Sequence, residues 1–413
     1  MKILLFSQYF YPEPFIINDL VKTLEMQGHD IVVYTGKPNY PEGVIYPGFS
    51  SKGFEKTTFN GSVKLYRIPL RPRGKLGAKN LFFNYMSFVV SGIRFLNRIE
   101  EDDFDVILSF GLSPITSTIP AIFYKWKKKK SLFLWVQDLW PESLVATGYI
   151  TNRIVLFFVK VLVKWIYSCC DVVLIQSHGF HKPISEYVDK KKIVFYPNSI
   201  RVEKTLPIVT IPETLNRLLD DFFCVVFAGN LGKAQSLNTI LDAAEELNDL
   251  TGLKFVLIGA GSELEWLKEQ KEMRHLHNVE LVGRLEMDKM SFVYSKSDVL
   301  IVTLADNETI NLTIPSKIQS YLSSGKPIVA SLNGEGARVI KNANCGLVSE
   351  ACDSHEFSEN IKSVYLLTET ERIEMGRNGL DYFNEHFNMD YQAENLIRIF
   401  EEFKSEEGIS KLS

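Results

Sequence analysis

A lysine in the stretch 313–330 stands where a side chain could bind a phosphate. The segment reads Thr-Ile-Pro-Ser-Lys-Ile-Gln-Ser-Tyr-Leu-Ser-Ser-Gly-Lys-Pro-Ile-Val-Ala. Pro315 suits the first turn of a helix and Gly325 suits its end, which places Ser316 and Lys317 at the open helix N-terminus. An ammonium there could neutralise a leaving diphosphate, on which charge develops in the transition state. The alternative is a solvated lysine, which the helix dipole mildly disfavours, and we favour the phosphate site.

A glycine-containing turn at 228–237 is a second candidate phosphate site. It follows the predicted strand 222–227, reads Ala-Gly-Asn-Leu-Gly-Lys-Ala-Gln-Ser-Leu and leads into a predicted helix. Strand, turn and helix N-terminus together present backbone N–H groups to a phosphate. Because every Rossmann unit needs a tight turn here, a purely structural turn is an equal alternative. The candidate contacts are Gly229, Lys233, Gln235 and, in the corresponding turn after the next strand, Gly259.

The first half of the chain also places polar groups directly after predicted strands. Asp138 follows a buried strand in the order Gln-Asp-Leu-Trp-Pro-Glu, a position where α/β enzymes carry catalytic residues. On the residues alone, the simpler interpretation is a turn aspartate that caps its loop. Glycine after the preceding strand would allow a ligand to approach the backbone closely. The further candidate contacts are Gly111, Gln137 and, in the rigid loop after the second strand, Asn39 and Tyr40.

These residues belong to a chain that alternates short apolar runs with helical patterns, which is typical of a parallel α/β fold. The predicted strands of the first half are 2–7, 30–35, 63–68, 105–109, 132–137, 171–176 and 192–196. Those of the second half are 222–227, 254–258, 279–282, 298–303, 327–331 and 346–348. Two such doubly wound series predict two sheets, with ligands at the carboxyl ends of their strands.

A length of 413 residues suits two domains better than one. We predict an N-terminal domain at 1–200 and a C-terminal domain at 217–384, separated by a polar, proline-containing stretch and facing a cleft. An aromatic-rich helix at about 385–405 could pack back on the first domain.

Composition excludes several functions. The apolar content of 46% and the charged content of 23% are those of a soluble globular protein. A net charge of −4 argues against nucleic acid as a partner. The five cysteines and seven histidines show neither C-x-x-C nor H-x-x-x-H spacing, so we predict no disulfide framework and no metal site. The chain begins at once with a strand-like run, and its apolar stretch 154–169 is too short to span a bilayer, so we expect a cytoplasmic protein.

Two basic stretches next to aromatic residues bear on a membrane contact. An aromatic run at 81–88 follows four basic residues, and 125–130 reads Lys-Trp-Lys-Lys-Lys-Lys. Such segments suit an interface with anionic lipid. The alternatives are a core-facing helix for the first stretch and a solvated lysine loop for the second. Because both basic stretches lie on one domain, we expect a peripheral contact with the anionic inner membrane surface. The basic residues before the aromatic run are Arg71, Arg73, Lys75 and Lys79.

Taken together, these segments resemble the family-4 retaining glycosyltransferases of GT-B fold. Within that family the chain is most similar to the bacterial surface-polysaccharide branch (O-antigen, capsule or colanic acid) that includes N-acetyl-L-fucosaminyltransferases. The resemblance covers nearly the whole chain. It is carried by Gln-Tyr-Phe-Tyr-Pro-Glu at 8–13, Tyr-Thr-Gly-Lys-Pro-Asn-Tyr-Pro-Glu-Gly at 34–43, Trp-Val-Gln-Asp-Leu-Trp-Pro-Glu at 135–142, Tyr-Pro-Asn at 196–198, Phe-Ala-Gly-Asn-Leu-Gly-Lys-Ala-Gln at 227–235 and Ile-Pro-Ser-Lys at 314–317.

The resemblance implies a function for each half. A UDP-sugar donor would bind the C-terminal domain, and an acceptor, here a polyprenyl-diphosphate-linked saccharide, would bind the N-terminal one. Such enzymes need no metal or other cofactor and retain the anomeric configuration, with the donor's own phosphate assisting deprotonation of the acceptor. Asp138 and Lys317 would then serve catalysis, and the sugar moved would be an N-acetylated amino or deoxyamino sugar.

The chain also departs from the family pattern. The family's phosphate-binding Arg and Lys after the first strand of the C-terminal domain correspond to Asn230 and Gln235. The two glutamates of its E-x7-E pair correspond to Leu312 and Ser320, and its His-Asp pair reads Gln-Asp. These changes shift phosphate binding onto Lys317, with Lys233 and Arg284 as helpers. Asn230 and Ser320 are still predicted to contact the donor.

Two other functions fit the same fold. A GT-B-fold UDP-sugar epimerase would share the cleft but would need acid and base carboxylates near the donor, and the donor motifs offer few. A non-enzymatic two-domain sugar-binding protein would close on its ligand, but proteins of that kind are usually exported.

Overall fold

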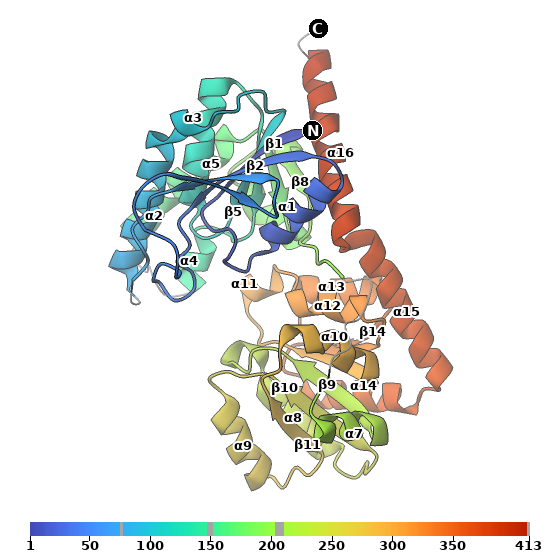
Figure 1. Cartoon of the computed structure of the whole chain (residues 1–413). Helices are drawn as coiled ribbons and strands as arrows, with labels where there is room; N and C mark the ends of the chain where they lie inside the picture. Colours follow the sequence, from blue (N-terminus) through green and yellow to red (C-terminus); the bar gives the residue numbers. More distant parts are fainter. Residues whose placement is uncertain (75–76, 147–151, 203–209, 411–413) are drawn as a thin grey trace. The chain divides into compact units, whose positions relative to one another are not determined.

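The computed structural model describes residues 1–74, 77–146, 152–202 and 210–410 of the chain. They form two compact units, drawn in Figure 1. Unit 1 comprises Met1–Ser199 and Met389–Ser413, and unit 2 comprises Ile200–Asn388. Lys75 and the middle of the polar stretch between the two halves lie outside the described residues. Each unit is a mainly parallel sheet covered by helices, the Rossmann-like organisation that the sequence predicts.

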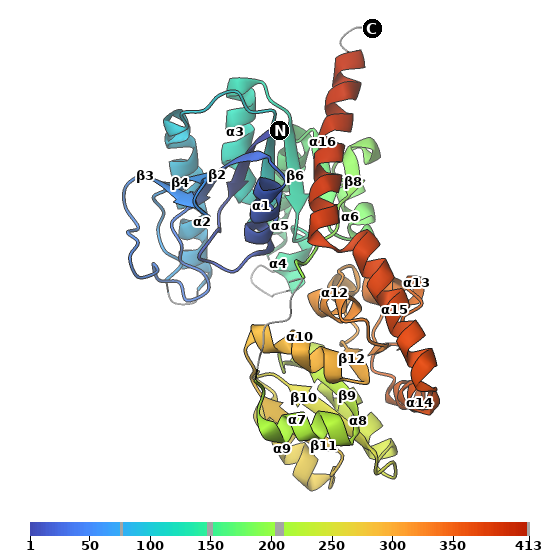
Figure 2. The ribbon, with the colours of Figure 1, turned by 45° about the vertical axis from the view of Figure 1, so that its right-hand side comes forward.

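The described part of unit 1 contains an eight-stranded sheet in the order β3-β4-β2-β1-β5-β6-β7-β8, in which only the β3–β4 pair is antiparallel. Its strands are β1 (Lys2–Ser7), β2 (Asp30–Gly36), β3 (Glu55–Phe59), β4 (Val63–Ile68), β5 (Val106–Gly111), β6 (Leu132–Val136), β7 (Val172–Ile175) and β8 (Ile193–Phe195). The sequence did not predict β3, which lies at the edge of the sheet (Figure 2). It reads Glu-Lys-Thr-Thr-Phe and alternates exposed with half-buried residues, so it has no apolar run to mark it.

Helices cover both faces of this sheet (Figure 1). They are α1 (Ile16–Met26), α2 (Ala78–Arg94), α3 (Ile119–Lys128), α4 (Glu142–Ala146), α5 (Arg153–Cys169), α6 (His181–Ser185) and α16 (Met389–Ser410). α1 packs against α16, whereas α3 packs against both α2 and α5. Within the described residues, no helix combines the length and the hydrophobicity that crossing a membrane requires.

The last helix, α16, completes the hydrophobic core of unit 1. Leu396 and Phe400 are fully buried against the side chains of α1 and of the central strands. The Phe400 ring meets Phe133 of β6 edge-on, with the ring centroids 4.6 Å apart. At the start of α16, the side-chain amide of Gln27 donates a hydrogen bond to the carbonyl oxygen of Asp390 at 2.9 Å. The C-terminal end of the chain is therefore part of the N-terminal fold.

Unit 2 contains a parallel sheet whose six described strands have the order β11-β10-β9-β12-β13-β14. Its strands are β9 (Phe223–Ala228), β10 (Leu253–Ile258), β11 (Val279–Gly283), β12 (Val299–Thr303), β13 (Ile328–Ser331) and β14 (Gly346–Ser349). Its helices are α7 (Glu213–Asp221), α8 (Leu237–Glu246), α9 (Leu264–Met273), α10 (Met287–Lys296), α11 (Glu308–Asn311), α12 (Ser316–Ser323), α13 (Gly334–Asn342), α14 (Ser354–Leu366) and α15 (Glu369–His386). Alternate residues of β9 enter the two cores that lie on opposite faces of the sheet.

Each sheet has one place where the order of its strands reverses. In unit 1 the chain runs outward from β1 through β2 and then returns to place β5 on the other side of β1. In unit 2 the same reversal occurs between β9 and β12. The loops that leave such neighbouring strands diverge onto opposite faces, so a crevice opens at their carboxyl ends. The fold thus defines in advance where a ligand can bind in each unit.

We predict that Phe400→Ala lowers the free energy of unfolding by about 3 to 5 kcal/mol, because it empties a fully enclosed position between α16 and β6. Urea denaturation of the purified chain would measure the loss. Glu394→Ala, at an exposed position of the same helix, is the matched control and should change the free energy of unfolding little. Equal stability of the Phe400 variant and the control would show that α16 does not contribute to the core.

Candidate active site

A cavity of about 580 Å³ opens in unit 2 at the reversal between β9 and β12. It is lined by the residues that follow β9, β10, β11 and β12 and by the start of α12. One wall is apolar and comes largely from α10, a contribution that the sequence analysis missed. Its members, Met287, Met290 and Tyr294, recur at helical spacing, and this periodicity was the signal that could have revealed the wall.

Lys317 lines this cavity from the first turn of α12, which begins one residue after Pro315. Its Nζ donates a hydrogen bond to Oε1 of Gln235 at 2.5 Å and lies 3.9 Å from the centre of the Phe227 ring. Gly229 lies against the same ammonium, since a Cβ at that glycine would be 3.3 Å from Nζ. The two phosphate candidates of the second half, the lysine and the glycine turn, therefore meet at one point.

Burial lowers the pKa of the Lys317 ammonium from its usual range to about 7. No carboxylate among the described residues offsets this desolvation. The ring face of Phe227 and the amide oxygen of Gln235 attract the cation, but neither carries a full charge. An anion bound in the cavity would favour the charged form and raise the pKa again.

Gly229 and Gly259 allow the turns after β9 and β10 to pack backbone against backbone. The Gly229 N–H donates to the carbonyl oxygen of Ile258, and the Gly259 N–H donates to that of Gly283, both at 2.9 Å. A Cβ on Gly259 would lie 1.8 Å from the Gly229 carbonyl oxygen, and the φ angles of the two glycines are +145° and +156°. The turns need glycine at both positions whatever they bind.

The loop after β9 is held in place by residues that the sequence analysis did not single out. The hydroxyl of Tyr321, a fully buried residue of α12, accepts a hydrogen bond from the Ala228 N–H at 2.9 Å. The Thr303 hydroxyl donates to the carbonyl oxygen of Gln235. Tyr321 follows Lys317 by four residues and so lies on the same side of the helix, which is the only sequence signal that links it to the site.

The other predicted donor-side residues differ in where they lie. Asn230, Gly259, Arg284, Ser316 and Ser320 all line the cavity. Lys233 is exposed and is not among the residues that line it. The role of these residues in binding remains a prediction, but eight of the nine positions predicted from sequence for this side are brought together in one cavity.

In unit 1, Asp138 connects the loops that follow β5 and β6. Its Oδ2 accepts a hydrogen bond from the Ser113 N–H at 3.0 Å, and the indole N–H of Trp140 donates to the Ser113 hydroxyl at 2.9 Å. The Gln137 N–H donates to the Gly111 carbonyl oxygen at 3.0 Å, and a Cβ on Gly111 would lie 2.8 Å from a leucine side chain of β6. The structure thus shows the loop-capping interaction, which was the simpler interpretation of this aspartate.

A buried carboxylate organises the loops that follow β1 and β2. Oε1 of Glu13 accepts hydrogen bonds from the N–H groups of Asn39 and Tyr40, both at 2.8 Å, and its Oε2 accepts one from Phe10 at 3.1 Å. Burial raises the pKa of Glu13 to about 7, although the three N–H groups oppose the shift. In the sequence, Glu13 stands out only as part of a motif, because backbone N–H partners cannot be recognised from residue types.

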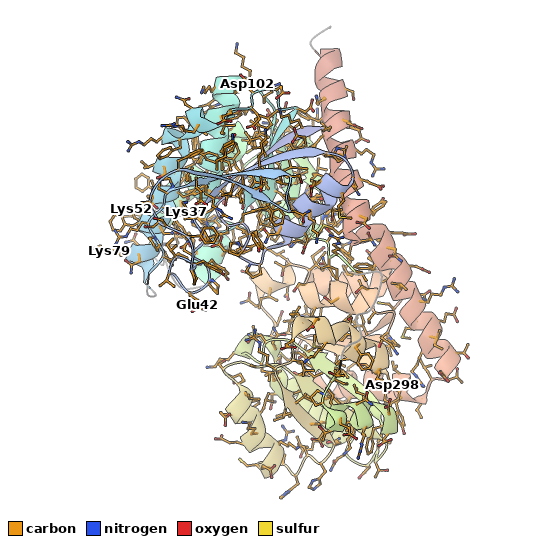
Figure 3. All side chains as sticks on the ribbon, viewed as in Figure 1. Lys37, Glu42, Lys52, Lys79, Asp102 and Asp298 are labelled. Atoms are coloured by element: carbon orange, nitrogen blue, oxygen red, sulfur yellow. The ribbon has the colours of Figure 1, made fainter. Side chains whose placement is uncertain are left out.

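Asn39 and Tyr40 take different positions in this loop. Asn39 is fully buried, and its Oδ1 accepts hydrogen bonds from the Arg73 N–H at 3.1 Å and from the Asn84 amide at 3.3 Å. Its side chain therefore orders the loop and does not reach the surface. Tyr40 is partly exposed and lies beside the Tyr9 ring, with the Arg73 guanidinium 5.0 Å from the centre of its own ring. Lys37 of the same loop, labelled in Figure 3, has Glu55 as its ion-pair partner.

The two units differ in the chemistry that they can support. Unit 2 combines a buried ammonium, a helix N-terminus, an arginine and an apolar wall, which together suit an organic phosphate. Unit 1 presents ordered polar and aromatic loops at the strand ends. Among the residues that the structure describes, no three His, Cys, Asp or Glu side chains come together as a metal-binding group.

The sequence is similar to known glycosyltransferase sequences. Residues 216–381 match the family model for glycosyl transferases group 1. WcaI of Escherichia coli (strain K12), provisionally named a colanic acid biosynthesis glycosyl transferase, is 22% identical over 338 residues, which are 79% of this chain and 82% of WcaI.

Solved structures resemble the chain over almost its whole length. Sucrose-phosphate synthase from Thermosynechococcus elongatus matches with a TM-score of 0.72 and 15% identity, over 98% of this chain and 99% of that one. A trehalose-6-phosphate structure from E. coli, bound with UDP-2-fluoro glucose, has a TM-score of 0.70 and 12% identity, over 97% and 99%. HepE of Anabaena in complex with UDP has a TM-score of 0.65 and 12% identity, over 97% and 100%. The chain therefore has the GT-B fold, and residues 216–381, within its second unit, match the glycosyl transferases group 1 model.

Proposed function

We propose that the protein is a glycosyltransferase that moves a sugar, with retention of configuration, from a UDP-sugar to a lipid-linked saccharide. The observation that carries the proposal is the position of Lys317, whose ammonium lies at the head of α12 in a cavity at the strand reversal of unit 2. A diphosphate in that cavity would meet both the cation and the N–H groups of the helix.

The size and lining of the cavity support a nucleotide-sugar as the donor. Its volume of about 580 Å³ lies in the range of small-molecule sites, and its apolar wall suits the flat face of a base. Solved structures of the same fold were obtained with UDP and with UDP-2-fluoro glucose, and we extend that class of ligand to this chain. The group 1 domain match over 216–381 contains the whole cavity.

The contact between Lys317 and Gln235 supports a relocated phosphate site. In the glycosyltransferase family that the chain resembles, a phosphate-binding lysine stands at the position of Gln235. The amide oxygen of Gln235 lies 2.5 Å from the ammonium of Lys317. We infer that Lys317 of α12 supplies its positive charge close to the place where the family's lysine, in the loop after β9, would supply it. Arg284, which lines the cavity and is exposed, can add a second positive charge.

The proposed reaction needs only the chain's own groups and the substrates. The acceptor oxygen forms a bond to the anomeric carbon on the face from which the bond to the diphosphate breaks. The acceptor proton passes to an oxygen of that diphosphate, so the configuration is retained. Lys317 and the N-terminus of α12 stabilise the negative charge that remains on the leaving group, and we propose that no metal is required.

The acceptor is assigned to the loop ends of unit 1. Tyr40, Gln137 and Asp138 lie in loops after strands of one sheet, and Gly111 is the last residue of β5. The Glu13 carboxylate and the Ser113–Asp138 hydrogen bond keep the loops in place. The relative named for colanic acid biosynthesis supports an acceptor from surface-polysaccharide synthesis, namely a polyprenyl-diphosphate-linked saccharide. We propose an N-acetylated amino or deoxyamino sugar as the group transferred.

The function is tested by incubating the purified chain with a panel of UDP-sugars, with and without a lipid extract that contains lipid-linked saccharides. We expect release of UDP and labelling of the lipid fraction only when the extract is present, and activity that persists in EDTA. Lys317→Ala should lower this transfer by about a hundredfold or more, because one preorganised charge at a leaving group is worth that factor. Lys268→Ala, at an exposed position of α9, is the control. A change of sugar configuration without acceptor would indicate an epimerase, and binding without turnover would indicate a sugar-binding protein.

The affinity for the donor should depend on pH through Lys317. Its pKa is about 7 in the free protein, and a bound diphosphate raises it, so the complex holds a proton that the free protein loses as the pH rises through that value. The dissociation constant of UDP-glucose should therefore be flat below about pH 7 and rise by up to about tenfold per pH unit above it. Calorimetry in buffers of different ionisation enthalpy would measure the proton uptake directly. Lys317→Met should abolish it, and unchanged uptake in that variant would assign the proton to another group.

Asp138→Asn should lower transfer while leaving the affinity for UDP unchanged, because the residue belongs to unit 1 and the nucleotide site to unit 2. An asparagine retains an oxygen that can accept the Ser113 N–H, so the loop should stay ordered and the loss would report the missing charge. Steady-state kinetics and UDP binding would be measured side by side. Full activity in Asp138→Asn, together with loss of activity in Asp138→Ala, would show that Asp138 acts only by capping its loop.

A further inference from the structure

The N-terminal part of α5 is apolar on nearly every side, and the other described residues of unit 1 leave it exposed. Ile154, Phe157, Phe158 and Val161 are 69%, 61%, 65% and 52% exposed. The burial of this helix is confined to its second half, where Val163, Ile166 and Tyr167 enter the core. A helix that is hydrophobic all round is normally enclosed by protein or lipid, so its exposed half requires a covering surface.

The exposed aromatic surface continues onto α3. Trp126 of α3 is 51% exposed and meets Trp165 of α5 with the ring centroids 6.2 Å apart. Phe123, one turn earlier in α3, lies 5.4 Å from Trp126. Further along, α2 packs against α3 and exposes Phe82 and Phe83. The ring contacts join the exposed surfaces of α3 and α5, and the neighbouring helix α2 adds two further exposed aromatic rings. We call the exposed surface of these three helices the α2–α3–α5 face.

The charges on these three helices have one sign. Their sequences contain no aspartate or glutamate. The basic residues that they carry are Lys79, Arg94, Lys125, Lys127, Lys128, Arg153, Lys160 and Lys164. This is unusual in a chain whose acidic residues outnumber its basic ones, with 50 against 46. Positive charges around exposed aromatic and branched side chains are the pattern of a surface that binds anionic lipid.

Several of the lysines remain available for such a contact. Lys160 and Lys164 are exposed and take part in none of the ion pairs that the described residues form. Lys79, at the start of α2, lies at the periphery of unit 1 (Figure 3). Two others are engaged within the fold, since Lys125 pairs with Asp171 and Lys128 with Asp102. The stretch 125–130 is therefore mostly the end of a helix, and not the solvated loop considered as an alternative from the sequence.

We propose that the α2–α3–α5 face is the surface by which unit 1 binds the headgroup region of an anionic bilayer, with α5 lying in the plane of the membrane as its main anchor. Phe157 and Phe158 enter the acyl boundary, while Lys160 and Lys164 contact lipid phosphates. Trp126 and Trp165 suit the same depth of the bilayer, at its boundary with water, because an apolar ring and a polar N–H can both be accommodated there. The proposal extends the proposed function by naming the surface on which a lipid-linked acceptor is met, but binding to lipid itself requires neither substrate.

The full chain is tested by sedimentation with vesicles of phosphatidylcholine alone and with vesicles that also contain phosphatidylglycerol. We expect binding to the anionic vesicles that weakens with salt, and little binding to the neutral ones. Phe157→Ser with Phe158→Ser should lower the partition coefficient by more than about tenfold, since burying one such side chain is worth about that factor. Lys160→Gln with Lys164→Gln should lower it by about fivefold for each lysine.

Matched controls come from unit 2. Leu366→Ser with Ile373→Ser removes two exposed apolar side chains of 73% and 61% exposure, and Lys268→Gln with Lys362→Gln removes two exposed charges. Both control pairs should bind vesicles like the wild type, and all variants should keep the same UDP affinity and melting temperature. Loss of vesicle binding with retained UDP binding would therefore leave the donor site of the proposed function intact.

Three outcomes would overturn the proposal. The first is a wild-type chain that does not sediment with anionic vesicles. The second is vesicle binding that the phenylalanine pair does not weaken. The third is a wild-type dimer that the phenylalanine pair converts to a monomer in light scattering, because a second copy of the chain would then be the covering surface.

Discussion

The ammonium of Lys317 is the constraint on which the donor side of the molecule depends. It is held in a largely apolar setting between a phenylalanine ring and an amide oxygen, with its pKa lowered to about 7. Burying a cation without a paired carboxylate carries a desolvation cost in the free protein, and a bound anion would offset that cost. The surrounding structure admits such an anion. Gly229 has no side chain to fill the space beside Nζ, and Tyr321 holds the end of β9 so that this space stays open.

The topology of the sheets explains why this site is assembled from distant residues. In unit 2 the loops after β9 and β12 leave in opposite directions, so the glycine turn and the head of α12 meet although 88 residues separate Gly229 from Lys317. Unit 1 repeats the same reversal between β1 and β5, and hydrogen bonds to Glu13 and Asp138 order the loops that follow its strands. One architecture thus gives an open, cationic site in one unit and an ordered, polar surface in the other.

Much of the fold was predictable from the sequence because parallel strands buried on both faces are continuous apolar runs. β3 was not predicted, because an edge strand with one polar side lacks a continuous apolar run. α16 was expected near its observed place, because its aromatic residues recur at helical spacing. Most residues of the cavity could be predicted because they directly follow strands or stand at the start of a helix. Tyr321 and Glu13 could not, because their partners are backbone N–H groups that any residue would supply. Asn39 reads as a surface amide in the sequence, and only packing reveals that it is buried.

The stretch 154–169 shows how a sequence criterion can be correct and still miss the property that matters. Its length and its two lysines argue against crossing a bilayer, and α5 in fact packs its second half on the sheet of unit 1. Whether its first half is a core helix depends on whether a neighbour covers it, and no residue pattern carries that information. Phe157 and Phe158 remain open to solvent, and the same helix face carries Lys160. A soluble core would exclude that lysine, whereas a phospholipid surface provides an apolar layer for the rings beside an anionic one for the ammonium, so a single surface satisfies both.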